Sequence, residues 1–144
     1  MLYFAYGSNM DWPRIKERCP SVRFVCVAKL EKHKFDFTRE CKAGYGVMDI
    51  VSDPADVVWG VVYQIDELDL GRLDRAEGCR PGGADGAYRR VERMVFEDGD
   101  LKKPLTVATY EVIAKSGPYK PSQEYKDHFV DGANHWRLPP DYIA

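Results

Sequence analysis

The sequence predicts a single α+β domain built on a curved, mostly antiparallel β-sheet or barrel. Most apolar or alternating segments are short enough to be strands, and turn-forming residues separate them. These strands do not alternate regularly with helices, which disfavours a doubly wound parallel sheet. The chain has 144 residues, 44% of them hydrophobic, so we expect one domain over residues 1–144 with one core.

The first element is an aromatic strand over residues 2–6, which breaks into the turn Gly7-Ser8-Asn9-Met10. Gly7 tolerates a positive φ, and the side chains of Ser8 and Asn9 can bond their own backbone. A helix is expected over about residues 12–18, with Asp11 or Trp12 near its cap and Pro13 in its first turn. A strand that turns into a helix directs several backbone N–H groups at one point, which can bind an anion. An ordinary tight turn is the simpler interpretation of the same residues.

Strands account for most of residues 22–63. From Val22 to Lys29 the pattern predicts a strand that buries Val22, Phe24, Cys26 and Ala28 on one face, continuing as extended chain to Phe37. A nearly continuous apolar run over 57–63 predicts a central strand buried on both faces, in which Gly60 indicates a bulge or a close backbone approach. Between these segments we expect a loop over 38–46, a short strand over 47–51 and a turn at 52–54.

The second half of the chain predicts two helices and a hairpin. A helix over about 66–76 has Leu68, Leu70, Leu73 and Ala76 on its apolar side, and a glycine-rich loop over 78–87 follows it. Strands over 88–97 and 104–114 are joined by a turn at Asp98-Gly99-Asp100. Ser122 caps a helix over about 123–133 that Gly132 ends, and the proline-containing tail at 138–142 is expected to be extended.

Composition excludes several classes of protein. The 21 basic and 23 acidic residues give a net charge of −2, so we expect no nucleic acid and no membrane as a partner. The first residues lack the pattern of a signal peptide, and a cytoplasmic location is expected. Neither the four cysteines nor the three histidines have the spacing of a metal site, so we expect no metal and free thiols. The sequence leaves a homodimer open.

Glu77 is the first candidate for acid–base chemistry. It follows a helix that has an apolar face, and the helix dipole disfavours a negative charge there. Partial burial would raise its pKa further, toward the range of a proton shuttle at neutral pH. A solvated surface carboxylate is the alternative. Similar alternatives hold for Tyr6, Tyr88 and Tyr125, as pocket or core residues, and for Arg89 and Arg90, as substrate-facing or edge-strand charges.

Several short motifs occur in one order along almost the whole chain, from Tyr3 to Tyr142. They are Tyr-Gly-Ser-Asn-Met at 6–10, Val-Trp-Gly-Val-Val at 58–62, Leu-Asp-x-x-Glu-Gly at 73–78, Tyr88 at the start of a strand, Pro-Ser-x-x-Tyr at 121–125 and Leu-Pro-x-x-Tyr at 138–142. In this order and spacing, the chain resembles the γ-glutamylcyclotransferase family. The resemblance implies a small mixed or antiparallel β-barrel of about half a dozen strands with short flanking helices.

The resemblance also implies a reaction and its residues. The α-amine of a γ-glutamyl amino acid attacks its own γ-carbonyl, which closes 5-oxoproline and releases the amino acid without a cofactor. Matched by motif, Glu77 is the catalytic residue that moves the protons. The substrate-binding residues implied are Tyr6, Gly7, Ser8, Asn9, Met10 and Tyr125, and the partner is a small γ-glutamyl molecule.

One segment departs from the family pattern. Residues 79–87 are longer than expected, so the leaving group is left open. A γ-glutamylamine or another γ-glutamyl amide is the alternative substrate, and Arg80 is a residue that can decide between them. A non-catalytic binding protein of the same fold is the more distant alternative, although such a protein would be expected to lack the glutamate at position 77.

Overall fold

The computed structural model of the protein describes residues 1–40, 46–76, 88–113 and 115–143. The described strands form a closed barrel in the spatial order β1-β3-β2-β4-β5. Neighbouring strands are antiparallel except β1 and β5, which are parallel, so the prediction of a small mixed barrel is confirmed. The strands are β1 (Leu2–Ala5), β2 (Arg23–Glu40), β3 (Gly46–Gln64), β4 (Tyr88–Glu97) and β5 (Pro104–Val112).

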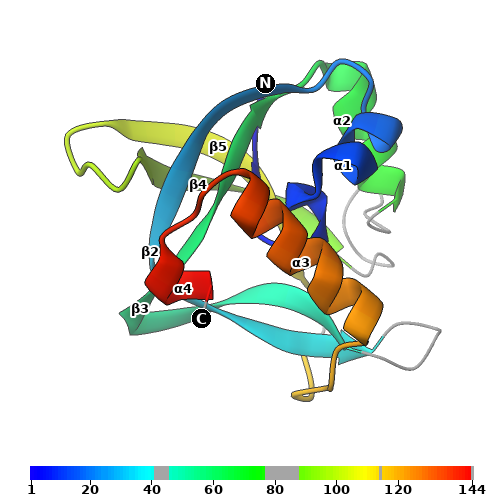
Figure 1. The fold of residues 1–144 in the computed structure, drawn as a ribbon, viewed down its shortest axis with the longest axis vertical. Helices are drawn as coiled ribbons and strands as arrows, with labels where there is room; N and C mark the ends of the chain where they lie inside the picture. Colours follow the sequence, from blue (N-terminus) through cyan, green and yellow to red (C-terminus); the bar gives the residue numbers. More distant parts are fainter. Residues whose placement is uncertain (41–45, 77–87, 114, 144) are drawn as a thin grey trace.

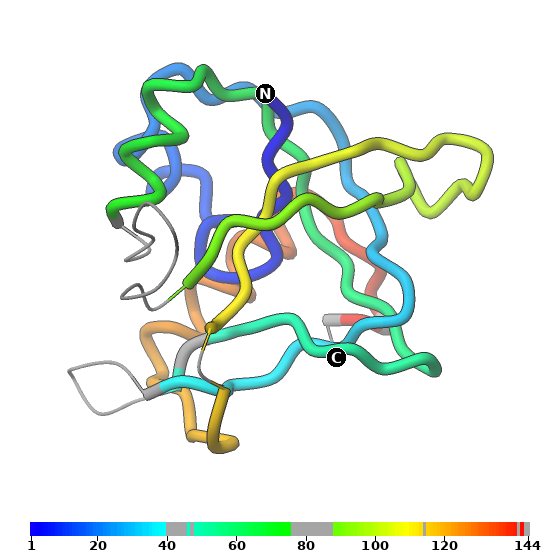
Figure 2. Tube along the Cα trace, turned by 180° about the vertical axis from the view of Figure 1, so that it is seen from behind, coloured from blue at the N-terminus to red at the C-terminus, as the bar shows by residue number. Residues whose placement is uncertain are grey.

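Helices flank this barrel on one side and at one end. Figure 1 shows α1 and α2 together near one end, while α3 runs across the barrel. Seen from behind, the far end of the β4–β5 hairpin projects from the rest of the molecule (Figure 2). The helical elements are the 3₁₀ turn η1 (Ser8–Met10), α1 (Trp12–Arg18), α2 (Glu67–Ala76), α3 (Gln123–His135) and α4 (Pro140–Ile143).

The strand predicted over 57–63 is confirmed as a central one. This part of β3 pairs with β1 on one side and with β2 on the other. Gly60 is required by a close approach, because a Cβ there would lie 2.3 Å from the carbonyl oxygen of Ala5. The backbones of β3 and β1 are therefore in close contact just before β1 leads into residues 7–10.

The expected turn at 52–54 is wrong, since β3 is one continuous strand. Its pairing with β2 jumps from Glu31↔Val57 to His33↔Ser52, so four residues of β3 face the single residue Lys32. Pro54 lies in this irregular stretch, where its missing N–H removes no bond to β2. The turn signal in the sequence marks a large bulge rather than the end of a strand.

A smaller bulge explains why Phe24 is not buried as predicted. Phe24 pairs with Tyr63 and Cys26 with Val62, so β2 holds one extra residue between them. The bulge turns Phe24 outward, where 43% of it is exposed and its ring stacks on Trp136 with centroids 4.3 Å apart. Alternation alone cannot show where a strand gains a residue.

Helix α2 has a different buried face from the one predicted. Leu70 and Leu73 are buried, but Leu68 is 66% exposed, since two residues along a helix turn the side chain to nearly the opposite side. Asp69 is buried on this face as well, and its carboxylate accepts the Ser21 N–H at 2.8 Å. Hydrogen bonds from Ser21 hold the pKa of the Asp69 carboxyl below its ordinary value.

The end of helix α3 and the tail that follows it both differ from the prediction. Helix α3 begins at its Ser122 cap as expected but continues past Gly132 to His135. Gly132 packs on η1, so its role is close contact rather than helix termination. The tail is not extended throughout, because Pro140 begins α4 as its first residue, a position that requires no N–H bond.

The predicted β4–β5 hairpin is confirmed. Its strands pair from Tyr88↔Val112 to Phe96↔Pro104. The turn includes Asp98 and Gly99, which both have positive φ.

Candidate active site

Residues 7–10 form the turn between β1 and α1, as predicted. The Met10 N–H donates to the Gly7 carbonyl at 3.0 Å and the Asp11 N–H to the Ser8 carbonyl at 3.1 Å, which closes η1. The amides of Gly7 and Ser8 donate to no other residue that the structure describes. Two adjacent unpaired amides can hold an oxygen atom that carries negative charge.

Gly7 is required for space rather than for a positive φ. Its φ is −124°, so the turn does not use the positive φ that glycine tolerates. A Cβ on Gly7 would lie 3.2 Å from the hydroxyl of Tyr125 and 3.5 Å from the Met48 sulfur. The absent side chain therefore leaves this phenol in contact with the turn.

Tyr125 reaches Gly7 because of how α3 begins. The Ser122 hydroxyl accepts the Tyr125 N–H at 3.1 Å, which caps the helix and places Tyr125 in its first turn. The Tyr125 hydroxyl accepts the N–H of Met48 at 3.1 Å. The structure thus brings together Gly7, Met48 and Tyr125, which come from three distant parts of the chain.

Two further contacts hold α3 against this turn. His128 Nδ1 lies 2.5 Å from Asp11 Oδ2, and the Trp136 indole N–H donates to the Met10 carbonyl at 2.8 Å. Of the two expected cap residues, Asp11 is the N-cap residue of α1, but its carboxylate binds α3 instead of the first-turn amides. The position of Tyr125 is therefore fixed by contacts along most of α3.

The side chains of Tyr6 and Asn9 belong to the framework of the site. Both residues are buried. The Tyr6 hydroxyl donates to the Tyr110 carbonyl at 2.7 Å, and the Asn9 amide donates to the Tyr3 hydroxyl at 3.0 Å. The Asn9 side-chain oxygen accepts from Arg18 at 3.1 Å. These bonds hold the turn in place from both of its ends.

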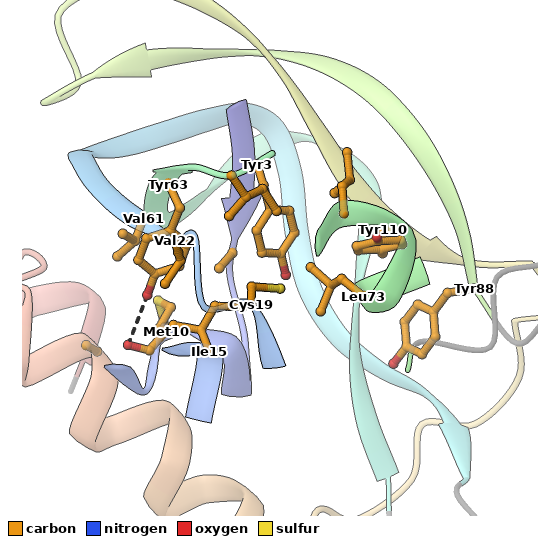
Figure 3. Close-up of a cluster of buried hydrophobic side chains, with 14 of the residues drawn as sticks. Tyr3, Met10, Ile15, Cys19, Val22, Val61, Tyr63, Leu73, Tyr88 and Tyr110 are labelled. Atoms are coloured by element: carbon orange, nitrogen blue, oxygen red, sulfur yellow. Dashed lines mark hydrogen bonds between the residues drawn. The ribbon is translucent and has the colours of Figure 1, made fainter. Parts of the chain in front are cut away.

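Met10 is fully buried in the core beneath the turn. Figure 3 shows the hydroxyl of Tyr63 directed at the Met10 carbonyl, a contact of 3.4 Å. Burial raises the pKa of the Tyr63 phenol above its ordinary value, so it stays a neutral donor. The N–H and the carbonyl of Met10 thus both form hydrogen bonds within the protein. Ser8 is half-buried and lies nearer the surface.

Glu77, the candidate catalytic residue, lies outside the described residues. It directly follows Ala76, the last residue of α2, in the sequence. Near that end of α2, the Asp74 carboxylate accepts a 2.5 Å hydrogen bond from the Tyr110 hydroxyl. Figure 3 shows Leu73 of α2 on the same side of the core cluster as Tyr110 and Tyr88.

Tyr88 is connected to the site through Met48. Its hydroxyl donates to the Met48 carbonyl at 2.9 Å, so this one residue of β3 bonds both Tyr88 and Tyr125. Met48 itself gives no signal in the sequence. It becomes part of the site only because β3 curves past the start of α3, which the sequence does not reveal.

Arg89 and Arg90 do not lie unpaired toward a substrate. Arg89 donates to the Glu111 carboxylate at 2.7 Å, and Arg90 lies 3.3 Å from Asp74. Both arginines thus pair with acidic side chains on neighbouring elements.

Cys19 and Cys26 are buried free thiols. Burial raises the pKa of each of these thiols to about 11. Over the described ranges, no group of three or more metal-binding side chains comes together. Cys41 and Cys79 lie outside those ranges. Among the helices described, none combines the length and apolar character needed to cross a membrane.

Comparison with known proteins identifies the family. The AIG2-like family matches residues 57–144. The human protein named gamma-glutamylcyclotransferase is 37% identical over 149 residues, which cover 98% of this chain and 74% of the human one. The bovine protein of the same name is 38% identical with the same coverage.

A solved structure gives the same answer for the fold. A protein described as a gamma-glutamyl cyclotransferase superposes with a TM-score of 0.83 at 34% identity, covering 99% of this chain and 83% of that one. Sequence and structure thus agree with the resemblance carried by the short motifs. The chain belongs to the γ-glutamylcyclotransferase family, which is a family of enzymes.

Proposed function

We propose that this protein is a γ-glutamyl cyclotransferase that acts on γ-glutamyl amino acids. The α-amine nitrogen of the substrate attacks the carbon of its own γ-carbonyl, and the bond from that carbon to the leaving nitrogen breaks. The products are 5-oxoproline and the free amino acid. Nucleophile and electrophile belong to one molecule, so the protein must fold the substrate back and move protons.

The contact between Gly7 and Tyr125 is the observation that carries this proposal. The amides of Gly7 and Ser8 and the Tyr125 hydroxyl, 3.2 Å from the position of a Gly7 Cβ, form a group of donors at one turn. Such donors suit the α-carboxylate, or the oxygen of the γ-carbonyl as negative charge develops on it. Relatives named for this reaction, matched over 98% of the chain, support the same role.

We assign the proton transfers to Glu77. Its carboxylate takes a proton from the α-ammonium group, which makes the amine a nucleophile, and after the attack it takes the second proton that this nitrogen loses on forming the lactam. The carboxyl group passes these protons in turn to the leaving nitrogen, which departs as the ammonium group of the amino acid. The family motif Leu-Asp-x-x-Glu-Gly and the position of Glu77 just after α2 support this assignment. No oxidant, reductant or further co-reactant enters the balance.

A substrate panel tests the proposal. Purified protein is incubated with γ-glutamyl-alanine, other γ-glutamyl amino acids, γ-glutamyl amines and glutathione, and 5-oxoproline is measured by chromatography. We expect 5-oxoproline and the free amino acid in equal amounts from γ-glutamyl amino acids. Preference for a γ-glutamyl amine would establish the alternative substrate class. No 5-oxoproline from any donor would reject the cyclotransferase, and binding without turnover would indicate a binding protein.

We also propose a cytoplasmic location. Cys19 and Cys26 are unpaired thiols, which suit a reducing compartment. Cell fractionation tests this, and recovery of the protein outside the cytoplasmic fraction would contradict it.

A further inference from the structure

We propose that the proton on His128 controls how strongly the turn at residues 7–10 binds an anionic ligand. His128 faces Asp11, the residue that follows this turn, and a positive charge on its ring balances the Asp11 carboxylate. When His128 loses that charge, Asp11 is left as an unbalanced negative charge near the amides of Gly7 and Ser8. This inference rests on the proposed function, which assigns those amides to an oxygen atom that carries negative charge.

One face of α3 places His128 at the turn. His128, Gly132 and Trp136 are four residues apart, so they lie on the same face of the helical segment. Gly132 and Trp136 contact Met10, and His128 Nδ1 lies 2.5 Å from Asp11 Oδ2. The side chains of His128 and Asp11 are 28% and 16% exposed, so solvent screens their charges less than those of a surface pair.

Asp11 is joined to the turn through its backbone. Its N–H donates to the Ser8 carbonyl at 3.1 Å, and only two residues separate it from Ser8 in the chain. Its carboxylate caps no amide of α1, although an aspartate at this position ordinarily accepts a first-turn N–H. The charge of Asp11 is thus held beside the turn by α3 rather than by its own helix.

The hydrogen bond between the two side chains persists when His128 loses its charge. A carboxylate can only accept hydrogen bonds, so Nδ1 carries the shared proton in both charge states of the ring. The proton that leaves is therefore the one on Nε2. This nitrogen lies 4.0 Å from the carboxylate of Glu124, whose side chain is 89% exposed, so it is on the solvent side of the ring. Titration changes the charge beside the turn and leaves the contact with α3 in place.

The neighbouring elements carry other charged or titratable groups, namely Glu124 on α3, Arg14, Lys16 and Arg18 on α1, and Tyr63 on β3. Among these side-chain types and histidine, only histidine ordinarily changes charge between pH 5 and 8. Burial raises the pKa of the Tyr63 phenol, and the negative charge of Asp11 raises it as well. Tyr63 therefore stays neutral in this range, and the charge of Asp11 acts on a group that bonds the turn.

The chemistry of a glutamyl group makes it sensitive to this charge. Its α-carboxylate is negative, and its γ-carbonyl oxygen gains negative charge as the amine attacks. An unbalanced charge on Asp11 repels both, and dissolved salt reduces the repulsion. By linkage, an anionic ligand also favours the protonated form of His128. The simpler alternative is that His128 and Asp11 only brace α3 against the turn.

Two stable ligands distinguish these interpretations: 5-oxoproline, which carries a carboxylate, and 2-pyrrolidinone, the same ring without it. Their affinities are measured by calorimetry at about pH 5.5 and about pH 8.5, on either side of the ordinary histidine titration. The measurements are made in wild type and in Glu77→Gln, which removes the proposed catalytic carboxylate as a second source of pH dependence. Circular dichroism establishes that each protein is folded.

Three substitutions are compared in each background. His128→Asn keeps an N–H near the position of Nδ1 but cannot gain a charge. Asp11→Asn keeps an oxygen that accepts the His128 N–H but carries no negative charge. His33→Gln is the matched control, because that half-buried ring bonds the Glu31 carbonyl in β2.

We expect 5-oxoproline to bind roughly 3–10-fold more weakly at the higher pH, and 2-pyrrolidinone to bind equally at both. His128→Asn should bind 5-oxoproline weakly at both pH values, and His33→Gln should behave like its parent. Asp11→Asn should bind 5-oxoproline more tightly than its parent at the higher pH, because no negative charge remains beside the turn. A bracing role predicts instead that both substitutions weaken both ligands.

Binding of 5-oxoproline that does not change with pH overturns the inference, and so does weaker binding by Asp11→Asn at the higher pH. Loss of the pH dependence in His33→Gln would also overturn it, because the titrating group would then be His33. All three results include measured binding of 5-oxoproline and leave the proposed function standing. Failure of wild type to bind 5-oxoproline at either pH contradicts the proposed function itself, and this inference with it.

Discussion

Gly132 of α3 and Met10 of η1 meet backbone to backbone. A Cβ at position 132 would lie 2.4 Å from the carbonyl carbon of Met10 and 2.6 Å from its oxygen. One turn further along α3, the Trp136 indole donates to the same Met10 carbonyl. Because Gly132 has no side chain, α3 can lie this close to residues 8–10. The same close packing allows Tyr125, at the other end of α3, to contact Gly7.

The Gly132→Ala variant is expected to lose stability. The added methyl group meets backbone atoms that cannot move aside, so we expect a loss of about 1–3 kcal/mol in the free energy of unfolding, measured in urea. Gly71→Ala is the matched control, since Gly71 lies in α2 with nothing within 4 Å of an added Cβ. Alanine is a better helix former than glycine, so Gly71→Ala should raise the free energy of unfolding by up to about 1 kcal/mol. Equal effects of the two variants would show that the contact at Met10 is loose.

Glu77→Gln is expected to abolish turnover while the fold persists. Glutamine keeps the shape of the side chain but cannot take a proton from the α-ammonium group. The measurement is the rate of 5-oxoproline release, with circular dichroism to follow the fold. Glu67→Gln, which changes an exposed residue in the first turn of α2, should keep the wild-type rate. Turnover by Glu77→Gln within tenfold of wild type would remove Glu77 from the mechanism.

Gly7→Ala should raise KM several-fold with a small effect on the melting temperature. The new methyl group would lie 3.2 Å from the Tyr125 hydroxyl and would push the phenol away from the turn. In a Tyr125→Phe background that oxygen is gone, so the same change should cost less. A double-mutant cycle on KM measures the coupling, expected to be about 1 kcal/mol. Additive effects would mean that the two residues do not share a ligand-binding surface.

Asp49→Asn should destabilise the protein strongly. The Asp49 carboxylate accepts bonds from Thr38, Val112 and Lys115, and an amide cannot satisfy all of these donors. A loss of about 3–5 kcal/mol is expected in urea unfolding, as for other broken buried ion pairs. Asp53→Asn is the control, because that side chain is half-buried and, within the described residues, accepts a bond from the nearby Ala55 N–H alone. A loss below about 1 kcal/mol for Asp49→Asn would show that these bonds contribute little to the stability of the fold.

Stability should fall as the pH rises above about 9. Burial raises the pKa of the Cys19 and Cys26 thiols from the ordinary 9.0 to about 11, so the folded state keeps protons that the unfolded chain loses between these values. The stabilisation is complete below pH 9 and is lost toward pH 11. Urea unfolding at several pH values measures it, and a Cys19→Ala/Cys26→Ala variant should show a shallower fall. The same slope in both proteins would show that these thiols do not contribute.

Some parts of the site could be read from residue types and spacing. The Ser122 cap predicts where α3 begins and so places Tyr125 in its first turn. Gly60 marks a close backbone approach, and Asp11 marks the start of α1. These predictions succeed because each depends on residues that are neighbours in the chain or on a glycine whose meaning is steric.

Other parts could not be read in this way. Phe24 and Leu68 were predicted to be buried and are exposed, one because of a bulge and the other because of the direction in which α2 packs. Met48 was not singled out at all, although it contacts both Tyr125 and Tyr88. The positions of Phe24 and Met48 depend on the registers of β2 and β3, and that of Leu68 on how α2 packs, which no local pattern specifies.

The amino-acid order determined the elements, the caps and the family, because hydrophobic periodicity, capping residues and short motifs act over a few positions. The tertiary structure alone decided that Gly7, Met48 and Tyr125 meet, and that Met48 is bonded to both Tyr125 and Tyr88. Hydrogen-bond direction depends on which groups face each other in space, and residues separated by 77 positions are brought together only when the barrel closes.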